Sequence, residues 1–222
     1  MEIEVLKLTI ALDNKLSTLD AGKVRGFLGN LFSDDSHIHQ HRLDGSFIYR
    51  YPRIQYKIIE GQCILIGFGE GNETVKEIFN RLRSLNIRGR WQEILSSGLE
   101  IYKASFSSFP NEVTYTFLTP WLALNEKNYK KYHLMGSLQR RKELLESILI
   151  GNILSISKSL GYIVQQPLTA GIENIKEVQT RLKDIPMLGF LGRFSVNFEI
   201  PDYWGIGKSV SRGFGTVKKC SS

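Results

Sequence analysis

The chain has 222 residues, of which 42% are hydrophobic, enough for one large domain or two domains of roughly 100 residues with packed cores. Its 29 Lys and Arg residues outnumber 22 Asp and Glu residues, and the formal net charge of +7 favours a polyanionic partner. No apolar run approaches the roughly 18 residues of a membrane span, and "MEIEVLKLTIALD" does not resemble a secretory signal. We therefore expect a soluble, cytoplasmic protein with no membrane partner.

The first half of the sequence predicts a β-α-β-β-α-β unit. Its elements are a strand over 2–12, a helix over 21–32, a strand over 44–59 interrupted by Pro52, a strand over 62–69, a helix over 72–85 and a strand over 98–106. Asn72 is a suitable cap for the second helix. This order is that of a ferredoxin-like domain.

The second half reads as a partial repeat of the first. Its elements are a strand over 111–119 ending at Pro120, a helix from Ser137 to about Leu160, strand-like segments over 161–168, 176–183 and 189–200, and a last strand within "FGTVKK". A second helix is not visible, so it is degenerate or very short. We predict an α+β chain of tandem ferredoxin-like (RRM-like) domains over 1–108 and 109–222, with Pro110 and Asn111 at the boundary.

A glycine-rich, basic stretch, "GIGKSVSRGFGTVKK", spans 205–219. It matches only the end of a phosphate-binding P-loop, because Asp202 stands where the first glycine of that motif is required. A flexible backbone with many free N–H groups, flanked by Lys208, Arg212, Lys218 and Lys219, can contact an anionic backbone closely. The alternative is a solvated basic turn.

Three histidines, His37, His39 and His41, form the motif "HIHQH". Alternate residues of an extended segment share a face, so the three imidazoles could hold a metal ion, with Asp34 and Asp35 as further ligands. They could equally belong to a solvated loop. A third interpretation is acid–base chemistry, since neutral imidazole can take a proton from a ribose 2'-OH near neutral pH.

The next segment alternates cationic and aromatic residues. It contains Tyr49, Arg50, Tyr51, Arg53, Tyr56 and Lys57. The cations could stabilise the negative charge of a phosphorane, and the tyrosines could stack on a nucleotide. The same pattern is also typical of a half-exposed sheet edge.

Taken together, these features resemble the CRISPR-associated Cas six endoribonuclease family of the RAMP superfamily. The resemblance covers the histidine loop before "YRYPRIQYK", then "GQCILIGFGEG", "LTPWLALNEKNY" and "IPDYWGIGKSVSRGFGTVKK". The last motif is the most specific, because a glycine-rich loop with G-F-G before the terminal strand is the hallmark of that superfamily.

The resemblance implies an enzyme that binds the repeat of a precursor CRISPR transcript and cuts it without metal or other cofactor. The 2'-OH attacks the adjacent phosphate and leaves 2',3'-cyclic phosphate and 5'-OH ends. Non-catalytic RNA binding within a CRISPR effector complex and a metal-dependent nuclease are the alternatives. Repeat RNA, effector-complex subunits and a second copy of the chain are the candidate partners.

The resemblance also implies roles for particular residues. His39 and His41 are favoured over His37 as general acid and base, and Lys57 resembles the strand lysine that neutralises the scissile phosphate. The family often supplies a tyrosine from the first helix, but residues 21–32 contain none, so Tyr49 or Tyr51 would substitute. The expected RNA-binding residues are Gly205, Gly207, Lys208, Ser209, Arg212, Gly213, Gly215, Arg50 and Arg53.

Overall fold

The structure is a computed structural model that describes residues 1–32 and 50–221. These residues form two compact units. The N-terminal unit contains Glu2–Ala104 together with Ser211–Gly213, and the C-terminal unit contains Met1, Ser105–Val210 and the residues from Phe214 onward. In the part of the chain that is described, no helix is both long and apolar enough to cross a membrane.

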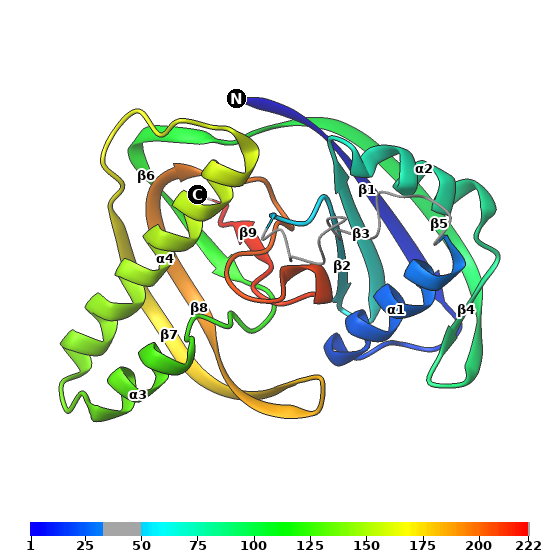
Figure 1. The fold of residues 1–222 in the computed structure, drawn as a ribbon. Coiled ribbons are helices and arrows are strands. Elements are labelled where there is room, and N and C mark those ends of the chain that lie inside the picture. Colours follow the sequence, from blue (N-terminus) through cyan, green and yellow to red (C-terminus); the bar gives the residue numbers. More distant parts are fainter. Residues whose placement is uncertain (33–49, 222) are drawn as a thin grey trace, which may run out of the picture. The chain divides into compact units, whose positions relative to one another are not determined.

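The N-terminal unit is a five-stranded sheet with two α-helices (Figure 1). Its elements are β1 (Glu2–Leu12), η1 (Thr18–Asp20), α1 (Ala21–Leu31), β2 (Ile54–Ile59), β3 (Gln62–Phe68), α2 (Gly71–Arg81), β4 (Ser84–Ile87) and β5 (Arg90–Ser105). The strand order is β2-β3-β1-β5-β4, with β3 antiparallel to both of its neighbours. This is the ferredoxin-like order with β4 added at one edge.

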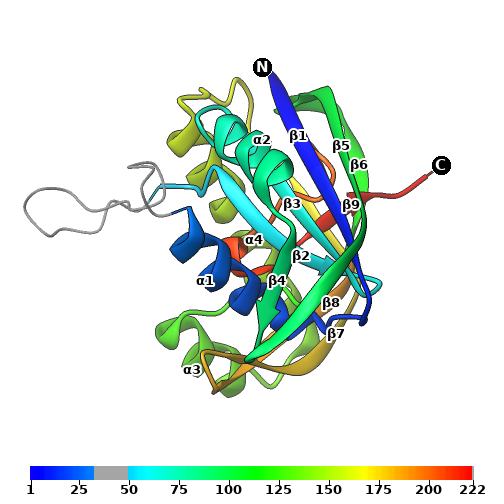
Figure 2. The same cartoon turned by 90° about the vertical axis from the view of Figure 1, so that its right-hand side faces the viewer.

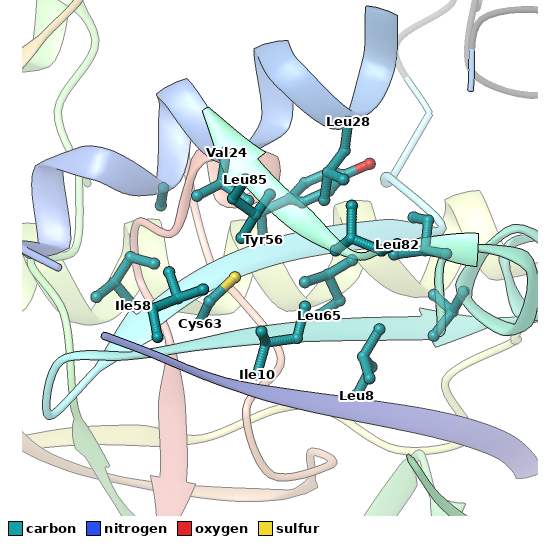
Figure 3. Packing of buried hydrophobic residues seen from close by; sticks show 14 of the residues in the cluster. Leu8, Ile10, Val24, Leu28, Tyr56, Ile58, Cys63, Leu65, Leu82 and Leu85 are labelled. Atoms are coloured by element: carbon teal, nitrogen blue, oxygen red, sulfur yellow. The ribbon is translucent and has the colours of Figure 1, made fainter. Parts of the chain in front are cut away.

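Both helices of this unit lie on one side of the sheet, as Figure 2 shows. Val24 and Leu28 of α1 are four residues apart, so they share a helix face, and both are fully buried. They pack with Tyr56 of β2, Cys63 of β3 and other apolar side chains in a single core cluster (Figure 3). This packing fixes α1 against β2, and these two elements flank residues 33–49 in the sequence.

The C-terminal unit is built on a four-stranded sheet. Its elements are β6 (Ser107–Phe117), α3 (Glu126–Leu134), α4 (Leu138–Leu160), β7 (Ala170–Leu182), β8 (Ile185–Glu199), the 3-10 helix η2 (Val210–Arg212) and β9 (Val217–Lys219). The strand order is β7-β8-β6-β9, and α4 packs along β7 on one face of the sheet (Figure 1). The prediction of an α+β chain with tandem ferredoxin-like domains is confirmed.

Several boundaries differ from the sequence prediction. The helix predicted over 72–85 ends at Arg81, because Leu85 and Ile87 are buried at alternate positions and form β4 instead. Residues 161–168 form no strand: Gly161 ends α4 with a φ of +71°, and Ile163 is 77% exposed. The helix that was not visible in the second half is the three-residue η2, and α3 was not predicted.

Two further differences concern strands. β6 continues through Pro110 and Asn111, with a register shift against β8 between Ser108 and Val113. Within the described residues, the strand predicted over 44–59 begins only at Ile54, after Pro52, which cannot donate a ladder hydrogen bond.

Candidate functional site

The predicted site residues fall into three groups. His39, His41 and Tyr49, together with His37, lie outside the described residues. Arg50, Arg53, Lys57, Arg212 and Gly213 belong to the N-terminal unit. Gly205, Gly207, Lys208, Ser209 and Gly215 belong to the C-terminal unit. The described residues include no group of His, Cys, Asp or Glu side chains that could hold a metal ion.

Backbone hydrogen bonds hold the glycine-rich stretch, one of them within the stretch and two to the segment that follows β6. The N–H of Ile206 donates to the carbonyl of Gly215 at 2.8 Å, and the N–H of Gly215 donates to Pro120 at 2.9 Å. The N–H of Lys208 donates to Leu122 at 3.3 Å. The expectation of many free N–H groups is therefore wrong for these residues, because an ordered loop satisfies its buried backbone internally.

Gly207 shows why glycine is needed in this stretch. Its φ is +89°, and a Cβ atom at this position would lie 2.6 Å from the indole Nε1 of Trp121. That distance is too short for any side chain. The close approach that the glycines permit is thus, at Gly207, an approach to the protein's own aromatic core.

The segment Ser211–Gly213 packs on the N-terminal unit. Gly213 is buried, and a Cβ atom there would lie 2.8 Å from the Cβ of Ala21, 3.1 Å from the carbonyl oxygen of Tyr56 and 3.8 Å from the Cα of Lys57. Ala21 begins α1, and Tyr56 and Lys57 lie in β2. The structure therefore places part of the glycine-rich stretch on the two elements that flank the histidine motif in the sequence.

Arg212 lies beside the first turn of α1. Its Nη1 atom is 3.4 Å from the position of a Cβ on Gly22. Burial, and next the positive charge of Arg25, lower the pKa of Arg212. Both arginines are half-buried, and none of the ion pairs between described residues includes either of them. Two neighbouring cations without a carboxylate partner in that set form a positive site suited to an anion.

Arg25 was not among the residues predicted from the sequence. It lies in the segment "AGKVRGFLGN", in which the glycine and lysine residues follow no spacing typical of a binding motif. Its neighbour in space is 187 positions away along the chain, which no local pattern reveals. A search for basic residues in the helix before the histidine motif would have found it.

Lys57 is fully buried in β2. It pairs with Ile64 of β3, and its side chain points away from the helix-covered face to which Tyr56 and Ile58 contribute. Burial lowers the pKa of Lys57 to about 7. With no exposed surface, the ammonium group can meet a substrate phosphate only if its surroundings rearrange.

The aromatic and cationic residues before β2 are largely engaged within the N-terminal unit. Arg53 forms an ion pair with Glu70 at 3.9 Å, and its guanidinium lies 5.5 Å from the ring centroid of Phe68. Tyr51 packs on the same ring at 5.8 Å. Burial raises the pKa of the core residue Tyr56 to about 12. Arg50 is exposed.

The remaining cations of the glycine-rich stretch differ in exposure and contacts. Lys208 is exposed, and the next residue, Ser209, has a positive φ of +61° that turns the chain sharply. Lys219 pairs with Glu199 at 3.7 Å, and Lys218 lies 5.9 Å from the ring centroid of Tyr203. Lys208 is thus the lysine of this stretch that is best placed to bind an external anion.

Two solved structures resemble nearly the whole chain, and a curated relative resembles part of it. A crystal structure of Cas6b is 39% identical, covers 99% of this chain and 100% of that one, and superposes with a TM-score of 0.90. A CRISPR RNA processing endoribonuclease Cas6b is 35% identical, with the same coverage and a TM-score of 0.80. An uncharacterized protein of Methanocaldococcus jannaschii is 43% identical over 141 residues, which are 64% of this chain and 95% of that protein.

Family models match both halves. The model of the Cas6b N-terminal domain matches residues 1–105, and the model of the Cas6b C-terminal domain matches residues 109–220. Both matches agree with the tandem ferredoxin-like fold. The chain belongs to the Cas6b family.

Proposed function

We propose that this chain is a metal-independent endoribonuclease that binds the repeat of precursor CRISPR RNA and cleaves it. Family membership and the similar CRISPR RNA processing endoribonuclease support the reaction class. The observation that carries the proposal is the packing of Arg212 and Gly213 on α1 and β2. An RNA phosphate held by Arg212 would lie beside the elements between which the histidine motif is inserted.

The proposed chemistry needs one base and one acid. A base removes the proton of a ribose 2'-OH, the 2'-oxygen attacks the adjacent phosphorus, and the bond from phosphorus to the 5'-oxygen breaks. An acid gives the leaving 5'-oxygen its proton. The products are a 2',3'-cyclic phosphate and a 5'-OH. We assign these two roles to His39 and His41, with Tyr49 orienting the reacting ribose.

Cations would stabilise the extra negative charge that develops on the phosphorane. Arg212, Arg25 and Lys208 are suited to bind phosphate because they form no ion pair with another described residue. Arg50 is exposed and is also available to bind phosphate, whereas Arg53 would first have to give up its ion pair with Glu70. Lys57 takes part directly only if RNA binding exposes it.

Cleavage of a CRISPR-repeat RNA in excess EDTA tests this function. We expect the full chain to cut the repeat once and to leave a cyclic phosphate, and a 2'-deoxy substitution at the scissile nucleotide to abolish the cut. Cleavage that EDTA abolishes would instead indicate a metal-dependent nuclease built on His37, His39 and His41. Equal cleavage of the 2'-deoxy RNA would overturn the proposed mechanism.

The alternative of a non-catalytic RNA-binding subunit is separated by a double variant. We expect His39→Ala/His41→Ala to bind repeat RNA like the parent chain but to lose cleavage by at least about a hundredfold, the range of general acid–base contributions. If neither protein cleaves and both bind equally, the chain acts as a binding subunit of an effector complex.

A further inference from the structure

A groove of about 530 Å³ lies on the C-terminal sheet, away from the glycine-rich stretch in the sequence. Its lining includes Thr116 of β6, Glu173, Asn174 and Lys176 of β7, and Arg193 of β8. Arg193 pairs with Asn174 on one side and with Thr116 on the other, so these three residues form one row across the strands. Side chains paired in this way project from the same face of a sheet.

The groove lies on the face opposite the helices. Glu177, next to Lys176 in β7, accepts a hydrogen bond from the hydroxyl of Tyr132 in α3 at 2.7 Å and pairs with Arg141 of α4 at 3.8 Å. Because successive strand residues point to opposite faces, Lys176 projects away from these helices. Lys176 and Arg193 are both exposed.

A register shift shapes the groove. Between Ile172 and Asn174, β7 carries one residue more than β8, and the extra residue is Glu173. Gly192 of β8 permits the close approach of β7 and β8 at this point, because a Cβ there would overlap the carbonyl oxygen of Asn174. Bulges of this kind redirect side chains, and here the result is a polar depression in the sheet.

The charges of the groove are available to a ligand. Neither Lys176 nor Arg193 takes part in an ion pair between described residues. The carboxylate of Glu173 accepts a hydrogen bond from the hydroxyl of Thr114 at 3.2 Å instead. Lys218 of β9 pairs with Thr116 and extends the same row with a further exposed cation.

We propose that this groove is a second RNA contact, in which Lys176 and Arg193 bind backbone phosphates and Glu173 faces a base. The inference rests on the proposed function. The carboxylate disfavours a simple anion such as free phosphate, whereas a nucleotide brings both a phosphate for the cations and amino groups that a carboxylate accepts. Thr116 and Asn174 add the uncharged polar groups that commonly contact phosphate and sugar.

The test compares two double variants that lose the same charge. Lys176→Gln/Arg193→Gln removes the groove cations, and Lys127→Gln/Arg140→Gln removes two exposed cations of α3 and α4 that form no ion pair with another described residue. Both are made in the full chain carrying His39→Ala/His41→Ala, so that RNA stays intact. Affinity for a repeat RNA with its single-stranded flanks is measured over a series of salt concentrations.

We expect the groove variant to bind about tenfold more weakly and to lose about two units of the slope of log affinity against log salt. The control should keep the parent slope. A groove variant with the parent slope, or one that only matches the control, overturns the proposal. Photocrosslinking of 4-thiouridine RNA to the unsubstituted groove should modify peptides containing Lys176 or Arg193, and crosslinks confined to other peptides would also overturn it.

The proposed function and the proposed groove contact can be refuted independently of each other. Cleavage by the chain with intact histidines decides the proposed function, and the salt slope decides the groove. If the chain never cuts RNA, but the slope of log affinity against log salt falls only in the groove variant, the second RNA contact is supported and the endoribonuclease activity is refuted.

Discussion

Lys57 places an amino group where the N-terminal sheet has no contact with solvent. Burial disfavours the charged form, and the pKa falls from 10.5 to about 7. Between these two pH values the unfolded chain holds a proton that the folded chain has released. The free energy of unfolding therefore rises with pH across this window, and below about pH 7 the folded protein carries this charge in a buried position.

We predict that the effect of Lys57→Met on the free energy of unfolding is more favourable at pH 6 than at pH 10.5 by about 3–5 kcal/mol, because methionine carries no charge that burial disfavours. The gain should shrink as the pH rises from about 7 to about 10.5. Urea unfolding at several pH values measures both effects. Lys127→Met, at an exposed position of α3, is the control and should leave the pH profile unchanged; identical profiles for the two variants would contradict the prediction.

At the scale of elements, the short segment around η2 joins the glycine-rich stretch to α1 and β2. Gly213 has a φ of +89° and no room for a side chain between Ala21 and Tyr56. Arg212 precedes it and owes its place beside α1 to this contact. Gly213 is needed for the packing of this segment on α1 and β2, and this packing in turn positions the guanidinium of Arg212.

We predict that Gly213→Ala destabilises the protein by about 1–3 kcal/mol, through backbone strain and the overlap with Ala21. It should also weaken RNA binding, because Arg212 would shift. Urea unfolding and RNA titration measure the two effects. Gly151→Ala, in the interior of α4 with open space around it, should stabilise by about 0.5–1 kcal/mol. A Gly213→Ala protein as stable as the parent would show that the segment does not need glycine.

The elements best predicted from the sequence are those in which the buried residues recur with the period of the helix or strand that they form. In α4, Leu145, Leu149, Ile153 and Ile156 are buried at helical spacing, and the helix was predicted almost to the residue. α3 was missed because Tyr132 is its single buried residue among those described, so it has no apolar stripe. The segment 161–168 has strand-forming residues, but none of them found a partner strand, and pairing is a property of tertiary structure.

The site was harder to predict than the fold. Composition identified Lys208 and Arg212 as candidate anion-binding residues, and the glycine pattern pointed to a close approach of backbone. What the backbone approaches, namely Trp121 at Gly207 and Ala21 at Gly213, is set by contacts between residues far apart in sequence. The burial of Lys57 and the proximity of Arg25 to Arg212 follow from the same long-range contacts.

At the scale of the whole molecule, the net charge of +7 is distributed among cations with and without carboxylate partners. Partnered cations such as Lys219 are already neutralised locally by a carboxylate. Those without a partner among the described residues, including Arg25, Lys208 and Arg212, can release the counterions of RNA when it binds. We expect affinity to depend on these three cations in and near the glycine-rich stretch, and to be insensitive to exposed charges on the C-terminal helices such as Arg140.

We predict that Arg25→Ala and Arg212→Ala each reduce the salt slope of RNA binding by about one unit, as loss of one phosphate contact requires. Lys208→Ala should do the same. Fluorescence anisotropy with a repeat RNA over a series of salt concentrations measures the slopes, and Arg140→Ala on α4 is the matched control. Slopes that remain at the parent value would place the RNA somewhere other than this stretch.

The membership of Ser211–Gly213 in the N-terminal unit has a consequence for genetic dissection of the protein. A gene fragment ending at codon 108 would encode Ala21 and Tyr56 without the backbone that covers them, and its complement would encode three residues with no surface on which to pack. Halves produced separately should therefore be poorly soluble apart and recover when co-expressed. The N-terminal unit is thus completed by three residues that the coding sequence of the other half supplies.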